Sequence, residues 1–504
     1  MHSRMSPWGS VSLVVALLLA GCGSSSTSPD AGTQVDAGVT VDAGVTVDAG
    51  VTDDAGTVDS GVAEALPCER TQGVCAGAKR AMVDGAYEPV CTARSYGADY
   101  EAAETRCDGL DNDCDGMTDP ATWAEVAPLG TPPTGSLVDS LPVAGGSLVV
   151  SVAGQDTVQI RRLDESLALQ ATTQVPVAPG VDPVTSVRLV RTSRGPALVY
   201  VGRYMSPSAV SQGRLVQLDE QGNPVGPPGG VVILEYPQFP VHAGVATSLD
   251  GQRLAVVWNV VTEDYRETQG LVVDADGKRL SGPWILFRTQ EHVLLSTPAA
   301  LALGDGGFLV MVVEDHGPES QSRIRLWHYN SELAAMSAER ALDVGNSPTA
   351  TLLSSAPGAG GTPGEPLLLY RETSARPHQL KQVRSLFTGG VPATLATASE
   401  GDTPWFGATM TSRGLQMAWL AVHSVSPEKT DDSLFNWEGR FWALGPNGIA
   451  ADWSPGPGPM PLHRFSQWVL MQELPGHWMG ALLMTATDTP AETHTLQSVR
   501  YCAP

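Results

Sequence analysis

The residues best suited to chemistry in this 504-residue chain form an acidic stretch, CDGLDNDCDG, from Cys107 to Gly116. Counted from Asp111, aspartates occupy positions 1, 3, 5 and 9 and a glycine occupies position 6, which is the pattern of an EF-hand calcium loop. Thr122 stands at position 12, where an EF-hand has a bidentate glutamate, and no flanking helices are indicated. We therefore predict an open calcium site with a Kd of ~10⁻⁴–10⁻³ M. Its predicted metal-binding residues are Asp111, Asp113, Asp115, Met117 and Asp119.

The wider segment CERTQGVCAG…VCTARSYGADYEAAETRCDGLDNDCDG, within residues 68–120, resembles the metal-binding motif of the MopE type. That motif is repeated in many exported proteins of myxobacteria and related bacteria, and its family name implies copper. Copper favours imidazole, thioether or thiolate ligands, whereas residues 68–120 contain no histidine and only two methionines, Met82 and Met117. Calcium is the ion we expect, with copper as the alternative. A disulfide-pinned acidic turn without metal is a third interpretation.

The N-terminus indicates export. Residues 1–21 carry a basic residue followed by about ten apolar residues, too few for the ~20 that span a bilayer. The tetrapeptide Leu-Ala-Gly-Cys that ends at Cys22 resembles a bacterial lipobox, so we expect lipidation of Cys22 and attachment to the membrane through the lipid anchor. An ordinary secretory signal is the alternative. The predicted location is the outer membrane or cell surface, with a lipid-anchored protein.

Residues 22–63 have the composition of a disordered stalk. The hexapeptide VDAGVT recurs, and seven aspartates occur between Asp30 and Gly61 without a lysine or arginine. Such a segment buries too little apolar surface to offset its ordering entropy. Calcium-binding β-helix repeats are a rival interpretation, but they have a nine-residue period with two glycines.

Six cysteines remain beside Cys22, and an oxidising compartment makes disulfides the expectation. These are Cys68, Cys75, Cys91, Cys107, Cys114 and Cys502. Five of them fall in a segment with few large apolar residues, which we assign to a Cys-rich metal-binding module at residues 64–123. Five cysteines cannot all pair internally, so we expect Cys502 to pair back to this module. Six cysteines allow fifteen pairings, which sequence alone does not resolve. A thiolate metal site is the alternative, but no CxxC motif occurs.

Residues 124–504 contain a repeated pattern of a strand, a glycine turn and a strongly apolar strand, followed by a third strand that ends in an Asp/Gly turn. Seven such units, spaced by about 50–60 residues, begin at residues 138, 186, 244, 298, 347, 406 and 467. Four antiparallel strands per unit predict an all-β fold, a seven-bladed β-propeller. Six or eight blades, or tandem β-sandwiches, are the alternatives.

No strong catalytic signature accompanies this domain. The sequence has no HExxH, no GxSxG and no P-loop, and a net charge of −24 argues against a nucleic-acid partner. His316 is interpreted as a surface residue and the tryptophans as packing residues. We expect a propeller used for binding or adhesion, with a protein or polysaccharide ligand. A degenerate propeller hydrolase or lyase is the alternative.

Overall fold

The structure is a computed structural model whose described part runs from residue 65 to residue 502. It leaves out residues 119–123, 130–137, 154–156, 205–209, 237–241, 291–292, 317–320, 338, 346–349, 355–364, 373–378, 398–404, 412–413, 425–434, 445–459, 463–466, 475–477 and 487–493. The predicted signal peptide, Cys22 and the predicted stalk lie outside the described residues, as does Asp119. Residues Ala65–Pro504 form one unit. Among the described residues, no helix is long and apolar enough to cross a membrane.

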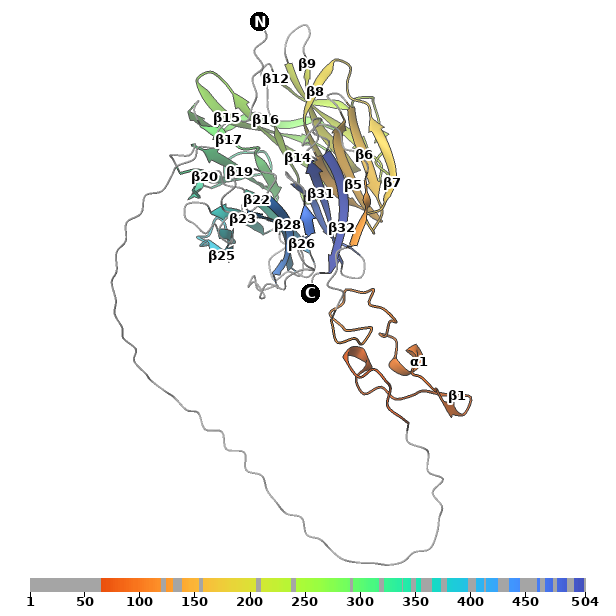
Figure 1. Ribbon diagram of the computed structural model, residues 1–504. Coiled ribbons are helices and arrows are strands. Elements are labelled where there is room, and N and C mark those ends of the chain that lie inside the picture. Colours follow the sequence, from red (N-terminus) through yellow and green to blue (C-terminus); the bar gives the residue numbers. More distant parts are fainter. Residues whose placement is uncertain are drawn as a thin grey trace, which may run out of the picture. The chain divides into compact units, whose positions relative to one another are not determined.

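Five consecutive antiparallel sheets, called blades 1 to 5, follow one another along the chain (Figure 1). Blade 1 contains β4 (Val138–Val143), β5 (Gly146–Ala153), β6 (Thr157–Leu163) and β7 (Leu169–Val175). Blade 2 contains β8 (Val181–Thr192), β9 (Gly195–Tyr204) and β10 (Val210–Leu218), with β11 (Pro224–Val225) and β12 (Val231–Tyr236) both paired to β10. Blade 3 contains β13 (Ala243–Thr247), β14 (Arg253–Val261), β15 (Tyr265–Asp274) and β16 (Arg279–Gln290).

Blade 4 contains β17 (Leu294–Leu295) and β18 (Ala299–Ala302), both paired to β19 (Phe308–Asp315), then β20 (Arg323–Tyr329) and β21 (Arg340–Asp343). Blade 5 contains β22 (Ala350–Ser354), β23 (Pro366–Glu372), β24 (Gln379–Val383) and β25 (Ala393–Thr397). This blade-by-blade strand order defines an all-β propeller, as the repeats predicted. The alternative of tandem β-sandwiches is therefore wrong.

Two further four-stranded sheets complete the domain. One contains β26 (Trp405–Thr411), β27 (Gly414–Ser424), β28 (Phe435–Leu444) and β29 (Met460–Leu462). The last sheet contains β30 (Gln467–Glu473), β31 (Trp478–Ala486) and β32 (His494–Cys502), and its outer strand is β3 (Ala124–Pro128) from the start of the domain. Neighbouring sheets contact through their first long strands, in the order β4, β8, β13, β18, β22, β26 and β30, and β30 contacts β4.

The second strand of each blade is apolar on both faces because it packs between two sheets. In β5, Leu148 and Val150 join a cluster with residues of blade 2, whereas Val149 joins a cluster with Trp478 and Leu482 of the last sheet. All three β5 residues are fully buried. Alternating side chains of one strand thus hold two different neighbours, so the fold needs no single large core.

The predicted turns after the third strands use one recurring device. Asp164, Asp219, Asp274 and Asn330 each follow or end a third strand, and each side-chain oxygen accepts hydrogen bonds from the N–H groups two and four residues later. A short polar side chain that satisfies two turn donors fixes the hairpin to the fourth strand. The Asp/Gly pattern in the sequence therefore marks real hairpins.

Polar side chains also link the first strands of neighbouring blades, which have free backbone groups facing each other. Asp139 Oδ2 on β4 accepts from Leu189 N on β8, at 2.7 Å. Ser186 Oγ on β8 accepts from Ala243 N at 3.2 Å. Such bonds satisfy donors that a sheet edge would otherwise leave unpaired.

Candidate metal site

The Cys-rich module has little regular structure: η1 (Gly73–Cys75), β1 (Met82–Val83), β2 (Ala86–Tyr87) and α1 (Ala93–Tyr96). Three disulfides hold it, Cys68–Cys91, Cys75–Cys114 and Cys107–Cys502, with Cα–Cα distances of 5.6, 5.9 and 5.5 Å. The expected link between Cys502 and the module is thus made by Cys107. The other four module cysteines pair within the module.

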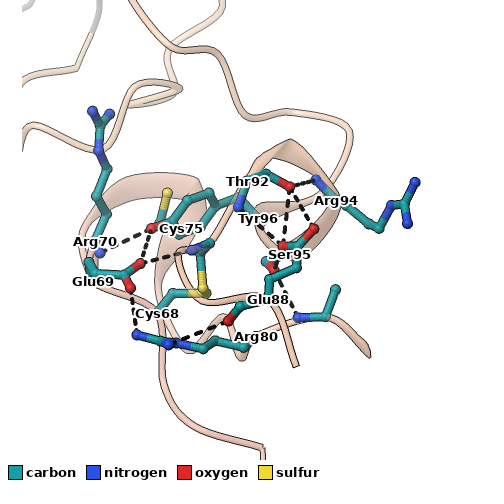
Figure 2. The surroundings of a disulfide bond; sticks show 12 residues. Cys68, Glu69, Arg70, Cys75, Arg80, Glu88, Thr92, Arg94, Ser95 and Tyr96 are labelled. Carbon is teal, nitrogen blue, oxygen red and sulfur yellow. Dashed lines mark hydrogen bonds and ion pairs between the residues drawn. A yellow bond between two sulfur atoms is a disulfide. The ribbon is translucent and has the colours of Figure 1, made fainter. Parts of the chain in front are cut away.

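Glu69 organises the half of the module around the Cys68–Cys91 disulfide (Figure 2). Its carboxylate accepts from Arg80 Nη2 at 2.7 Å, from Cys91 N at 3.1 Å and from Tyr96 Oη at 3.4 Å. Hydrogen bonds from its own N–H and from that of Cys91 lower the pKa of the Glu69 carboxyl. The Glu69 carboxylate thus holds this half of the module, and it does not belong to the group of carboxylates that converges in the acidic loop.

The acidic loop between Cys107 and Cys114 folds around Asp111. One Asp111 carboxylate oxygen accepts from Asp115 N at 3.1 Å and the other accepts from Gly116 N at 3.0 Å. Asp111 is 7% exposed. Its main-chain oxygen lies so close to Gly73 that a Cβ there would be 2.2 Å from it, which requires glycine at position 73. The Cys75–Cys114 disulfide fixes this approach of the Gly73 segment to the loop.

Three carboxylates converge at this loop. One oxygen from each of Glu104, Asp111 and Asp113 lies within 4.8 Å of the others, and the three residues are buried or half-buried. Oxygens bound to calcium lie 2.3–2.6 Å from the ion, so two ligands of one ion are at most about 5 Å apart. The spacing of these three oxygens is therefore compatible with one shared centre.

The structure places the predicted ligands in two groups. Asp111 and Asp113 belong to the acidic cluster, whereas Asp115 and Met117 are exposed and lie outside it within the described residues. Asp115 Oδ1 accepts from Met117 N at 2.8 Å, so this carboxylate caps a turn. The cluster is not the linear EF-hand arrangement that the spacing predicted, because Glu104 takes part in it and Asp115 does not. Asp119 lies outside the described residues.

Glu104 is the member that sequence reasoning missed. Its Oε2 accepts from Asn112 N at 2.7 Å, which brings it across the loop from a position three residues before Cys107. The run EAAETRC contains the signal, since it places acidic residues immediately before a loop that returns on itself. Glu104 lies seven residues before Asp111, outside the alternating aspartate pattern.

Asn112, between Asp111 and Asp113 in the sequence, carries an amide oxygen of the type that calcium accepts. Its side chain is fully buried, and its Nδ2 donates to Asp99 O at 2.7 Å. Among the described residues, no donor reaches Asn112 Oδ1. A buried amide oxygen without a hydrogen-bond donor destabilises the folded state. This oxygen belongs to the residue between the two loop aspartates of the cluster.

The donor set suits a hard cation. Carboxylate and amide oxygens are the ligands calcium prefers, whereas copper favours nitrogen and sulfur. Residues 65–118 contain no histidine, and every cysteine there is in a disulfide. Elsewhere in the described residues, no other group of three or more potential ligand side chains converges.

The tryptophans divide between packing and exposure. Trp258 is fully buried and Trp327 is 7% exposed, as the packing interpretation predicted. Trp284 on β16 is 54% exposed, and its Nε1 donates to Ser281 Oγ at 2.9 Å. His316 is half-buried, and its Nε2 lies 3.7 Å from a carboxylate oxygen of the buried Glu314.

Comparisons with known proteins give only distant structural similarities. No family model and no curated protein matches the chain. Among solved structures, a prolyl endopeptidase has 10% identity over 72% of this chain and 50% of its own, with a TM-score of 0.41. An endo-arabinase from Bacteroides thetaiotaomicron has 9% identity over 52% of this chain and 95% of its own, with a TM-score of 0.34. The polysaccharide lyase Uly1 has 9% identity over 74% of this chain and 91% of its own, with a TM-score of 0.41.

This chain covers about half the length of the prolyl endopeptidase. At these identities and TM-scores, no argument is drawn from the similarities. The class that the fold and site define is a β-propeller protein with a disulfide-linked acidic module, and this assignment depends on the strand order and the cystines.

Proposed function

We propose that this chain is an extracytoplasmic calcium-binding protein in which a Cys-rich module presents one calcium site beside a seven-bladed propeller used for binding or adhesion. The observation that carries the calcium site is the convergence of the Glu104, Asp111 and Asp113 carboxylates in a disulfide-clamped loop. The three side chains would hold the ion, and the Asn112 amide oxygen would be available to it. The loop would otherwise keep like charges close together in a partly buried place, which is unfavourable.

The seven-blade count is supported by the contacts between first strands, which run through all seven sheets and return from β30 to β4. It is also supported by the pairing of β3 with β32, which completes the last sheet with a strand from the start of the domain. Because strands from both ends of the domain share one sheet, the ring closes and no sheet edge is left exposed where the two ends meet.

The proposed location is outside the cytoplasm, with Cys22 as the lipid anchor to the outer membrane or cell surface. It is supported by the three disulfides, which use all six cysteines that follow Cys22. Stable disulfides form in oxidising compartments. The ligand of the propeller is expected to be a protein or a polysaccharide.

Calorimetric titration of the purified protein with CaCl₂ tests the site. The wild type is expected to bind one calcium ion with a Kd of ~10⁻⁴–10⁻³ M. Asp113→Asn should weaken binding by about tenfold or more, because it removes a cluster carboxylate. Asp115→Asn is the matched control: it removes the same charge from the same loop but should change Kd less than about threefold.

Two results would reject the assignment. Absence of calcium binding by the wild type would remove the site altogether. Equal losses in Asp113→Asn and Asp115→Asn would show that the ion follows the linear EF-hand pattern, or responds only to loop charge, and not the cluster that includes Glu104.

A further inference from the structure

We infer that calcium at the acidic cluster stabilises the closed ring of the propeller, with the Cys107–Cys502 disulfide as the link between the two. This inference rests on the calcium site and the ring closure proposed above. It assigns the site a structural role: the bound ion stabilises the junction where the two ends of the propeller meet.

The covalent part of the link starts at the loop itself. Cys107 is the first residue of the acidic stretch, and it is bonded to Cys502, the last residue of β32, across a sequence separation of 395 residues. β32 pairs with β3 on one side and with β31 on the other. The disulfide therefore connects the loop to the strand that holds the beginning and the end of the propeller together.

A hydrogen bond and an apolar cluster reinforce the disulfide. Trp478 Nε1 on β31 donates to Thr105 O at 3.2 Å, and Thr105 directly follows the cluster member Glu104. Cys107 is fully buried and Cys502 is 5% exposed. Around them pack residues from both ends of the ring: Leu129, Val149, Leu163 and Leu167 from its start, and Leu474, Trp478 and Leu482 from its end.

The segment after β3 is anchored to blade 1 by a buried cation. Arg161 on β6 is 3% exposed, and its Nε donates to Leu129 O at 3.1 Å. Its Nη1 donates to Ser151 Oγ at 2.6 Å. Leu129 itself is 1% exposed. The chain from the closing strand into blade 1 is thus fixed at the same junction that receives Cys107.

The physical consequence is linkage between metal binding and ring closure. An ion that binds the folded loop and not the unfolded chain stabilises whatever must be folded for the loop to form. Because Thr105 and Cys107 are held by the last sheet, ordering the loop orders this sheet as well. The coupling is reciprocal, so opening the junction should weaken calcium binding by the same factor.

Tryptophan fluorescence follows mainly the propeller, since ten of the twelve tryptophans lie within residues 124–504. The other two are Trp8, in the predicted signal peptide, and Trp123, the last residue of the module. Thermal unfolding of the full-length protein is followed in EDTA and in CaCl₂ at about 100 times the measured Kd. The wild type is expected to show a rise in Tm of about 3 °C with calcium. In the double variant Cys107→Ser/Cys502→Ser, calorimetry should still detect calcium, but the rise should fall below about 1 °C.

The control is Cys68→Ser/Cys91→Ser, which removes a disulfide from the same module and leaves the junction intact, so the rise should persist. If the Cys107/Cys502 variant does not fold, Trp478→Phe decides, because it keeps the disulfide and removes the N–H donated to Thr105, together with part of the ring that packs against Arg500. The rise should then be clearly smaller than in the wild type.

The outcomes separate the two proposals. A wild type that binds no calcium refutes the proposed function. A wild type that binds calcium without a change in the Tm of the tryptophan transition refutes only the stabilisation of the propeller ring by calcium. A full rise in the Cys107/Cys502 variant, or in Trp478→Phe when that variant decides, also overturns it.

Discussion

Replacing Asp139 by asparagine should stabilise the propeller at neutral pH. Asp139 lies on β4, and its carboxylate accepts from Leu189 N on β8 at 2.7 Å. Burial raises the pKa of Asp139 above its ordinary value, and it outweighs the opposing effects of Arg188 and of backbone N–H donors. The chain therefore keeps a carboxylate at a place where its charged form is disfavoured, in exchange for a bond between two blades.

The sign of the pH dependence follows from this shift. A carboxyl group whose pKa is higher in the folded state binds more protons there than in the unfolded chain, so stability falls as pH rises from about 4 through the folded pKa. Asp139→Asn removes that loss and keeps an oxygen that can accept from Leu189. The variant should match the wild type near pH 4 and exceed it at pH 7.

Asp139→Ala separates the hydrogen bond from the charge. Leu189 is 5% exposed, so removing the acceptor leaves a buried N–H unsatisfied. That loss costs about 1–3 kcal/mol relative to Asp139→Asn. Urea unfolding followed by tryptophan fluorescence between pH 4 and pH 8 measures both differences, with the exposed Glu165→Gln as a charge-matched control. An Asp139→Asn variant that is less stable than the wild type at pH 7, or a difference that does not change with pH, would refute this reasoning.

Two further predictions concern residues at or next to the first strands of the blades. Burial is the main cause, and the charge of Arg188 the second, of a pKa of His242 below its ordinary value. The contribution of His242 to stability is therefore lost as pH falls below about 6.5. His242→Gln should reduce the difference between the urea midpoints measured at pH 7.5 and pH 5. An unchanged pH profile would count against this. Gly244→Ala places a Cβ 2.1 Å from Pro298 O in the next blade and should lower the free energy of unfolding by about 1–3 kcal/mol. Gly306→Ala, at φ +83° with open space around it, should cost only about 1 kcal/mol, and equal or reversed costs would contradict the close approach.

Local patterns made the blades predictable from sequence. The apolar second strands and the Asp/Gly turns recur with a regular spacing, and both depend on residues close together in the chain. The side chain of Asp274, for example, caps a turn with donors two and four residues later. Such short-range bonds leave a direct trace in the order of residues.

Long-range pairings could not be predicted in the same way. β3 pairs with β32 near the other end of the chain, and nothing in the five residues Ala124–Pro128 specifies that partner. The cysteine count indicated that Cys502 bonds to the module, but the choice of Cys107 depends on the packed junction around Trp478.

The acidic cluster was predicted in part for a related reason. Asp111 and Asp113 were found because alternating aspartates are a local pattern. Glu104 enters the cluster through its bond to Asn112 N, eight residues away, whereas Asp115 lies outside the cluster and caps the Met117 N–H. Which carboxylates converge is decided by the folded loop, not by spacing.

The most direct measurement of the central claim is a crystal structure of the protein grown with calcium, with data collected for anomalous scattering. A single calcium peak is predicted between the carboxylates of Glu104, Asp111 and Asp113, with Ca–O distances of about 2.3–2.6 Å. A peak on Asp115 without Glu104, or no peak in the module at a calcium concentration well above the Kd, would contradict the account.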